Sequence, residues 1–299
     1  APISMAMAAK GHNVGWFFSR KDEKTHGEAT NLGQEDRIKK LTVGRAPKVD
    51  DAIIQLDDVF TAGDAKYEAN TFLKILGRSN LPLLAIAVDR QEVAIDSREA
   101  IAEYQEKTGT RVVSIVNAVD VYNVLKERNL ASERALERLA NYIRVYGTKD
   151  ARKTVGKLEQ KIIERDKSVI PACDVETIEK FEELIKQTAD IDKIGGYKIG
   201  SELGLKYGLP RVVETARKFT DKPVIYDHQK AGTDIPDTGK NFARTMKYSG
   251  IDTVIFFPQA GPETERAWIY HALDHGLKVI VGGRMTHPAY AVSEGGFIT

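Results

Sequence analysis

Short runs of apolar residues alternate along the chain with helix-length amphipathic patterns. In the first half, four apolar runs are each followed by a polar or glycine-containing loop: Val14–Phe18, Ile53–Asp57, Leu83–Asp89 and Val112–Val116. Runs that are apolar on both faces and separated by helical segments are typical of a buried parallel sheet. Crossover helices are predicted at Lys66–Gly77 and Ser97–Gly109.

The alternation restarts at residue 169. Five further strands are predicted, at Val169–Cys173, Gly196–Gly200, Pro223–Asp227, Thr253–Phe257 and Lys278–Gly282. Helical patterns lie between them, at Glu176–Ala189, Val212–Phe219, Gly239–Ser249 and Glu263–His275. This repetition predicts a (β/α)₈ (TIM) barrel of which about five strand–helix units are present.

A charged stretch, residues 127–168, separates the two halves. Its apolar positions fall at helical spacing: Leu130, Leu136, Leu139, Ile143, Leu158 and Ile162. Amphipathic helices in a solvated connector are therefore predicted. The expected class is α/β, with a first domain at residues 1–126, this connector, and a barrel at residues 169–299.

Composition narrows the class of protein. The 299 residues carry 44 Lys and Arg against 43 Asp and Glu, a formal charge of +1, which favours neither nucleic acid nor an anionic membrane as a partner. The sequence has neither a membrane-length apolar run nor signal-peptide features. The single cysteine, Cys173, excludes a disulfide within the chain and a cysteine-cluster metal site. We expect a cytoplasmic enzyme.

The first candidate site follows the predicted strand at residue 53. Asp57 and Asp58 precede a small-residue loop and then a helix. Unpaired N–H groups at that helix start, from Thr61 to Ala65, could cradle a 5′-phosphate. The two carboxylates could accept hydrogen bonds from ribose hydroxyls or meet a Mg²⁺ held mainly by a diphosphate. The alternative is an ordinary capped helix after a strand.

Residues 53–65 form a predicted strand, an Asp-Asp pair, a Thr-Ala-Gly loop and a helix start. This arrangement resembles the phosphoribosyltransferases, and within them the orotate phosphoribosyltransferases. Residues 18–28 are similar to that family's mobile basic loop, residues 87–92 to the segment whose arginine contacts the orotate carboxylate, and residues 110–125 to its closing strand and helix. The resemblance implies that Arg90 and Thr61 bind substrate. It implies phosphoribosyl-diphosphate contacts at Arg20, Lys21, Lys24, His26, Asp57, Asp58, Ala62, Gly63, Asp64 and Ala65.

The implied transferase chemistry suits these residues. Departure of diphosphate builds negative charge, which Arg20, Lys21, Lys24 and a Mg²⁺ cofactor could stabilise. The family's opening segment, with its early lysine contacts, has no counterpart before Ala1. We therefore expect that both ends of a longer parent protein are missing.

The second candidate site consists of charged residues at or after the carboxyl ends of predicted strands: Asp174, Lys198, Asp227, Lys230 and Asp234. In a parallel barrel these positions converge on one face. Alternating Lys and Asp side chains can neutralise one another there, so a purely structural ion-pair network is the alternative for any two of them.

These residues resemble the orotidine 5′-monophosphate decarboxylases. Residues 227–236 are similar to the family's Asp–Lys–Asp–Ile–Pro motif in the longer spacing of an archaeal-looking branch. The resemblance implies cofactor-free decarboxylation with Lys230 as proton donor, Asp227 against the leaving carboxylate, and Lys198 with a partner subunit's Asp234 holding Lys230. It also implies substrate contacts at Asp174, Thr238 and Thr286.

The order of the two segments resembles the bifunctional uridine monophosphate synthases. That resemblance implies orotate, phosphoribosyl diphosphate and orotidine 5′-monophosphate as substrates, and a homodimer. The alternative is a regulatory module that senses phosphoribosyl diphosphate, fused to a barrel of the sugar-phosphate aldolase or isomerase type. We interpret the remaining chemistry-bearing residues as structural: His271, His275, Cys173, Trp16 and Trp268.

Overall fold

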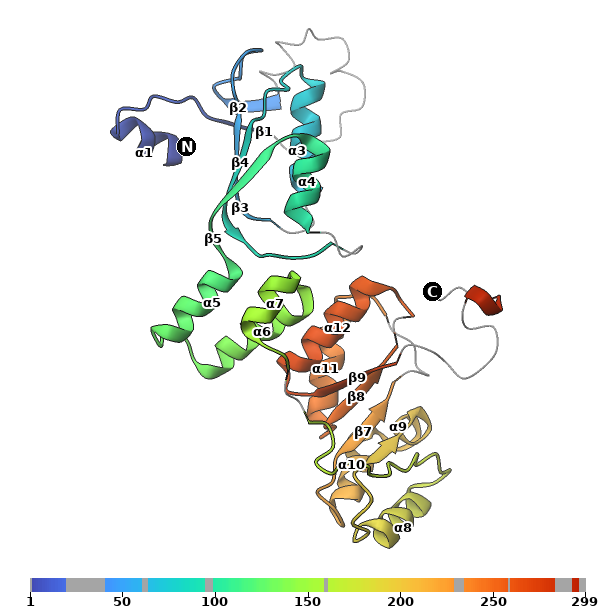
Figure 1. Ribbon diagram of the computed structural model, residues 1–299. Coiled ribbons are helices and arrows are strands. Elements are labelled where there is room, and N and C mark those ends of the chain that lie inside the picture. The colour runs from blue at the N-terminus through green and yellow to red at the C-terminus, as the bar shows by residue number, and fades with distance from the viewer. Residues whose placement is uncertain are drawn as a thin grey trace. The chain divides into compact units, whose positions relative to one another are not determined.

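The computed structural model describes residues 2–19, 41–60, 64–94, 99–158, 161–228, 234–257, 259–282 and 292–295. They fall into two compact units, Ala1–Asn123 and Val124–Thr299. Each unit is described by itself (Figure 1). Among the described helices, none has the length and apolar character needed to cross a bilayer.

The first unit is built on a parallel three-stranded sheet. Its elements are α1 (Pro2–Ala9), β1 (Phe17–Ser19), β2 (Thr42–Gly44), β3 (Ile54–Phe60), α3 (Asp64–Ile75), β4 (Leu83–Asp89), α4 (Ala100–Thr108), β5 (Arg111–Asn117) and α5 (Ala118–Glu127), which runs past the unit boundary. The sheet order is β3–β4–β5, and its register aligns the strand ends at Phe60, Asp89 and Asn117. The predicted parallel βα units are confirmed for these three strands.

The first predicted strand forms differently. Residues 17–19 pair antiparallel with residues 42–44 in a separate two-stranded sheet, so the expectation that residues 14–18 join the parallel sheet is wrong. The backbone of Gly44 has φ +103°, and a Cβ there would lie 2.4 Å from the carbonyl oxygen of Trp16. Glycine at this position therefore permits the close pairing that diverts the segment.

Helices α3 and α4 cover one face of the sheet β3–β4–β5 (Figure 1). The core of this layer includes four buried side chains from the strands and α4: Phe60, Leu84, Ile86 and Tyr104. The rings of Phe60 and Tyr104 meet edge to face, with their centres 5.5 Å apart. Burying side chains of this size stabilises the unit by about 1.5–3 kcal/mol each. This layer holds the strand ends in register.

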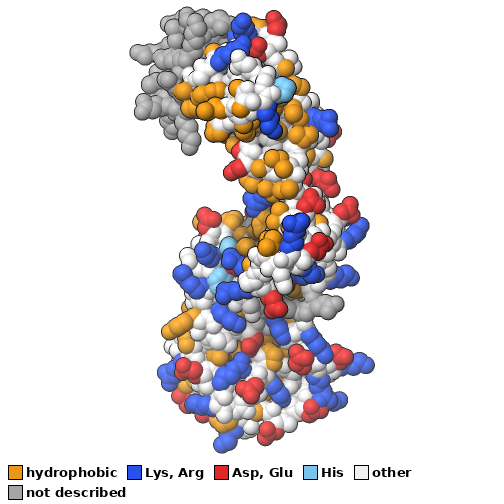
Figure 2. All heavy atoms as spheres, turned by 90° about the vertical axis from the view of Figure 1, so that its left-hand side faces the viewer, with side chains coloured by type: hydrophobic (Ala, Val, Ile, Leu, Met, Phe, Trp, Pro, Cys, Tyr) orange, Lys and Arg blue, Asp and Glu red, His pale blue; other side chains and the backbone are white. Residues whose placement is uncertain are grey.

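The opposite face of this sheet carries exposed apolar side chains. Ile54, Leu56 and Ile115 are 54%, 51% and 83% exposed. Figure 2 shows hydrophobic side chains gathered on this side of the first unit. The sequence predicted a sheet buried on both faces. Within the described residues, helices cover only one face of it.

The second unit alternates parallel strands with helices. Its elements are α6 (Glu133–Tyr146), α7 (Lys149–Val155), α8 (Ile178–Thr188), β6 (Tyr197–Ile199), α9 (Ser201–Tyr207), α10 (Leu209–Arg217), β7 (Val224–Asp227), α11 (Thr238–Tyr248), β8 (Thr253–Phe256), α12 (Pro262–Asp274), β9 (Lys278–Val281) and the 3₁₀ turn η3 (Val292–Glu294). The sheet order β6–β7–β8–β9 follows the chain, as in a partial (β/α)₈ barrel. The predicted strand at residues 169–173 appears as two parallel bridges, Val169 to Ile194 and Ala172 to Lys198.

The charged stretch contains two helices, α6 and α7, as predicted for Leu136, Leu139 and Ile143. Leu130, Leu158 and Ile162, which were also expected on helices, lie outside them. Ser132 and Thr148 cap the two helices by accepting hydrogen bonds from the backbone N–H groups of Ala135 and Ala151. Such caps satisfy otherwise unpaired donors in the first helical turn. The rings of Tyr142 on α6 and Tyr270 on α12 meet edge to face at 5.8 Å, so α6 packs on the barrel segment.

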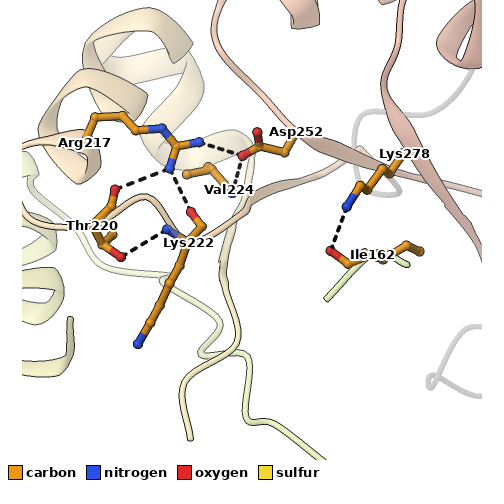
Figure 3. Close-up of polar contacts among 7 residues, drawn as sticks. All are labelled: Ile162, Arg217, Thr220, Lys222, Val224, Asp252 and Lys278. Atoms are coloured by element: carbon orange, nitrogen blue, oxygen red, sulfur yellow. Dashed lines mark hydrogen bonds and ion pairs between the residues drawn. The ribbon is translucent and has the colours of Figure 1, made fainter. Parts of the chain in front are cut away.

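A polar network closes the amino-terminal end of the four-stranded sheet (Figure 3). Asp252 Oδ2 accepts hydrogen bonds from Arg217 Nη2 at 2.6 Å and from the backbone N–H of Val224 at 2.7 Å. Arg217 Nη1 donates to the carbonyl of Lys222 at 2.7 Å. Asp252 therefore joins the end of α10 to the starts of β7 and β8.

We predict that Asp252→Ala lowers the free energy of unfolding of the second unit by about 1–2 kcal/mol, because the buried N–H of Val224 loses its acceptor. The half-exposed ion pair with Arg217 adds little to this loss. Chemical denaturation, with hydrogen exchange at residues 224–227, measures the change. Asp221→Ala, at an exposed position in the preceding loop, is the matched control; equal losses in both variants would contradict the prediction.

Candidate functional sites

The site in the first unit forms around β3, which extends three residues beyond its predicted end at Asp57. Asp57 and Asp58 both lie within this strand, so their side chains point to opposite faces of the sheet. Asp57 faces α3, where its Oδ2 lies 2.7 Å from Lys66 Nζ, whereas Asp58 is exposed. The two predicted acids therefore do not share one face.

Lys66 is a residue that the sequence interpretation missed. It lies in the first turn of α3, is 7% exposed, and its Nζ is 5.9 Å from the centre of the Phe60 ring. Burial alone would raise the pKa of Asp57, but the hydrogen bond and charge of Lys66, with the N–H of Asp58, lower it below its ordinary value. The signal in the sequence that could have indicated this ion pair is a lysine in the first turn of the helix that follows an Asp-bearing strand.

The predicted substrate arginine lies at the same edge of the sheet as the end of β3. Arg90 directly follows β4, and its Nε lies 2.9 Å from Glu92 Oε1. The preceding Asp89 accepts a 2.7 Å hydrogen bond from the N–H of Gln91, while burial raises the pKa of Asp89. Gln91 Oε1 accepts from the N–H of Val119 at the start of α5. The segment after β4 is thus held to the last residue of β4 and to the start of α5.

The site in the second unit is centred on a buried ion pair. Lys198 lies on β6 and Asp227 ends β7, with Nζ and Oδ2 2.7 Å apart. The side chain of Asp227 is 2% exposed and that of Lys198 is 25% exposed. The parallel register sets Lys198 beside Ile225, two residues before Asp227. The structure therefore brings these two predicted residues together.

Asp174 lies at the neighbouring strand end. The N–H of Cys173 donates to the carbonyl of Lys198 at 2.8 Å, and a Cβ on Gly200 would lie 3.0 Å from Asp174 Oδ1. Asp174 therefore lies beside the carboxyl end of β6. Cys173 is fully buried, and burial, with the charge of Asp174, raises the pKa of its thiol to about 12, in keeping with its structural interpretation.

Asp234 and Thr238 lie between β7 and α11. Asp234 Oδ1 accepts from the N–H of Ile235 at 2.8 Å, and Thr238 Oγ1 donates to the carbonyl of Ile235 at 2.7 Å. Asp234 is exposed, and Thr238 begins α11.

Several predicted site residues lie outside the described residues: Arg20, Lys21, Lys24, His26, Thr61, Ala62, Gly63, Lys230 and Thr286. Asp64 and Ala65 begin α3. His275 directly follows the last residue of α12, as a helix-end interpretation requires. In the described ranges, no cluster of three or more His, Cys, Asp or Glu side chains is arranged to hold a metal ion.

We predict that Lys66→Met raises the pKa of Asp57 above its ordinary value, because burial remains while the partner charge is lost. In the unmodified protein the lowered pKa means that Asp57 adds stability above an unfolded-state pKa of about 3.9. This stability is lost as pH falls through the lower folded-state value. A ¹³C NMR titration of the carboxyl group measures the shift. Lys74→Met, at an exposed position in the last turn of α3, is the control, and an unchanged Asp57 in Lys66→Met would contradict the prediction.

We also predict energetic coupling between Lys198 and Asp227. Lys198→Met leaves a buried carboxylate without this partner and lowers the free energy of unfolding by about 3 kcal/mol. Adding Asp227→Asn recovers part of that loss, because the buried charge is then gone. A double-mutant cycle by chemical denaturation should give a coupling of about 1–3 kcal/mol, and additive losses would contradict it.

Comparisons with known proteins find a family model that matches part of the second unit, and curated relatives that match about half of the chain. Residues 167–292 match the model of the Orotidine 5'-phosphate decarboxylase / HUMPS family. A solved orotidine 5'-monophosphate decarboxylase from Methanocaldococcus jannaschii is 25% identical, covers 41% of this chain and 57% of its own, and has a TM-score of 0.37.

Two curated relatives are orotate phosphoribosyltransferases. That of Vibrio parahaemolyticus is 36% identical over 132 residues, which are 44% of this chain and 55% of the relative. That of Clostridium acetobutylicum is 29% identical over 155 residues, which are 49% of this chain and 65% of the relative. The chain thus spans less than two thirds of the length of either relative. It joins an N-terminal segment related to the orotate phosphoribosyltransferases to a C-terminal segment of the orotidine 5'-phosphate decarboxylase / HUMPS type.

Proposed function

We propose that the protein catalyses the last two steps of UMP synthesis. In the first, orotate and phosphoribosyl diphosphate give orotidine 5′-monophosphate and diphosphate. In the second, orotidine 5′-monophosphate loses CO₂ to give UMP. The observation that carries the proposal is the buried Lys198–Asp227 pair at adjacent strand ends, within the segment that matches the decarboxylase family.

In the proposed decarboxylation, four charged residues of this chain have roles. The bond between C6 and the carboxylate breaks, CO₂ leaves, and the electron pair left at C6 takes a proton from Lys230. Asp227 would face the leaving carboxylate, and the charge of Lys198 would hold Asp227 in place. Asp234, from the partner subunit of a homodimer, would keep Lys230 charged and oriented. No cofactor takes part in this step.

Substrate binding completes the proposed decarboxylase site. Asp174, beside the end of β6, would accept hydrogen bonds from ribose hydroxyls. Thr238 and Thr286 would contact the substrate through their hydroxyl groups. These assignments rest on the resemblance of the motifs, on the position of Asp174 beside the end of β6, and on the position of Thr238 at the start of α11.

The transferase step would use the carboxyl edge of the first sheet. Arg90 would bind the orotate carboxylate, which requires an exchange of its ion pair with Glu92. The helix start at residues 61–65 would hold the 5′-phosphate. Arg20, Lys21, Lys24 and His26 would bind the diphosphate.

Mg²⁺ fits this half of the protein. The exposed carboxylate of Asp58 is a hard oxygen donor of the kind that Mg²⁺ prefers, whereas Asp57 is paired with Lys66. When bound to the diphosphate, Mg²⁺ supplies charge that favours departure of the leaving group. We further propose that the protein acts in the cytoplasm on these small molecules.

Product analysis tests the proposal. The chain is incubated with orotate, phosphoribosyl diphosphate and Mg²⁺, and separately with orotidine 5′-monophosphate, and the nucleotides are separated by chromatography. UMP in both reactions is the expected result. Diphosphate release without UMP would contradict the decarboxylase assignment, and unchanged orotate would contradict the transferase assignment. The sensing-module alternative likewise requires that no diphosphate be released.

We predict that Lys230→Ala lowers the decarboxylation rate by at least about a hundredfold, the lower range for loss of a positioned acid. The melting temperature should change little. Lys186→Ala, at an exposed position on α8, is the matched control and should keep full activity. Substantial turnover by Lys230→Ala would exclude Lys230 as the proton donor.

A further inference from the structure

Trp268 is a buried residue whose ring contacts three other aromatic rings. It lies on α12, is 4% exposed, and its ring stacks on those of His228 and Phe242 at centre distances of 5.7 and 4.8 Å. Phe256 on β8 meets it edge to face at 5.7 Å. Helix α11, strand β8 and His228, the residue after β7, therefore fix the orientation of the indole ring.

The ring's one polar atom reaches into the segment that follows β7. Trp268 Nε1 donates to the carbonyl of Ile235 at 3.1 Å, although the two residues are 33 positions apart. The same carbonyl accepts local hydrogen bonds from Thr238, from its hydroxyl at 2.7 Å and its N–H at 3.2 Å. The turn at residues 235–238 is thus anchored to a helix outside it.

Gly239 permits this contact. A Cβ at residue 239 would lie 2.7 Å from Cδ1 and 3.0 Å from Cγ of the Trp268 ring. Real Cβ atoms essentially never approach so closely, so any other residue here would displace the indole. Gly239 is the buried second residue of α11, and its absent side chain leaves the room that the ring occupies.

The indole therefore touches both described flanks of residues 229–233. His228 directly follows the buried Asp227, and Ile235 directly follows Asp234. A rigid, buried ring that contacts both flanks can fix the spacing between the two acidic residues of the motif.

We propose that Trp268 is a positioning residue of the candidate decarboxylase site. Through its ring and its bond to Ile235 it fixes the backbone that carries Asp234, the residue that each subunit of the proposed homodimer presents to Lys230 of the partner subunit. This inference rests on the proposed function. Trp268 does not touch the reacting atoms; it acts through the backbone of Ile235. Loss of the N–H should therefore lower kcat more than it changes KM.

The test replaces the donor and keeps the ring. Benzothienylalanine at position 268 has sulfur in place of the indole N–H, and Trp268→Phe is the simpler variant. Trp16→Phe, at the second tryptophan of the chain, is the matched control. Both kcat and KM for orotidine 5′-monophosphate are measured, together with amide hydrogen exchange at residues 235–239.

The sulfur variant should lose about 3- to 10-fold in kcat with KM within about twofold, the range expected for one hydrogen bond. Exchange at the N–H groups of Thr238 and Gly239 should become faster, while exchange in α8 stays unchanged. Gly239→Ala should reproduce both effects, because it displaces the ring.

Two outcomes separate this inference from the proposed function. Unchanged exchange at residues 235–239 in the sulfur variant overturns the positioning role, whatever the activity. Wild-type kcat in the sulfur variant overturns it as well. An unmodified chain that releases no CO₂ counts against the proposed decarboxylase function, and the exchange measurement still decides whether Trp268 anchors the turn.

Discussion

A carboxylate that is 2% exposed needs an opposite charge, and in the second unit Asp227 obtains it from Lys198. Removing one partner of a buried ion pair costs several kcal/mol, so this 2.7 Å contact contributes to the stability of the folded unit. The contact in turn requires that β6 and β7 run parallel in their observed register. The strand ends are therefore constrained by electrostatics as well as by the packing of apolar side chains such as Tyr197 and Val224. Trp268 extends the same constraint to the residues that follow β7.

Sequence reasoning placed this pair because two simple rules act together. Apolar runs such as residues 223–227 mark buried strands, and parallel strands bring their carboxyl ends to one edge. Charged residues that close such runs must therefore meet, and Lys198 and Asp227 do. The same rules predicted β3, β4 and β5 within a few residues. Helix α9 was not predicted, because only one helix, at Val212–Phe219, was expected between β6 and β7; Gly208, with φ +78°, separates α9 from α10.

The first candidate site shows where these rules fail. The period of two along a strand sends Asp57 and Asp58 to opposite faces, and a strand that was expected to end at Asp57 continues to Phe60. The three additional strand residues place both acids within β3, where Asp58 is exposed and Asp57 is partly buried. The antiparallel pairing of β1 with β2 was also missed, because three-residue strands carry too little periodicity to be recognised. The exposed side chains of Ile54 and Leu56 look like core positions in the sequence, and nothing in their pattern reveals which face is covered.

Both units use a lysine to hold an aspartate of the motif, but they obtain the lysine differently. Lys66 comes from the helix that directly follows the Asp57 strand, so a local βα unit is sufficient to form the pair. Lys198 comes from the preceding strand, 29 residues away, and the pair forms only when the sheet assembles. The first arrangement leaves Asp58 accessible at the sheet surface, whereas the second buries Asp227 and makes its pairing with lysine depend on tertiary structure. A buried, paired carboxylate suits a step in which a charged group must be held against a substrate charge, because the geometry is set before the substrate arrives. An exposed carboxylate near the carboxyl end of a strand suits ligands that bring their own metal ion and leave with it.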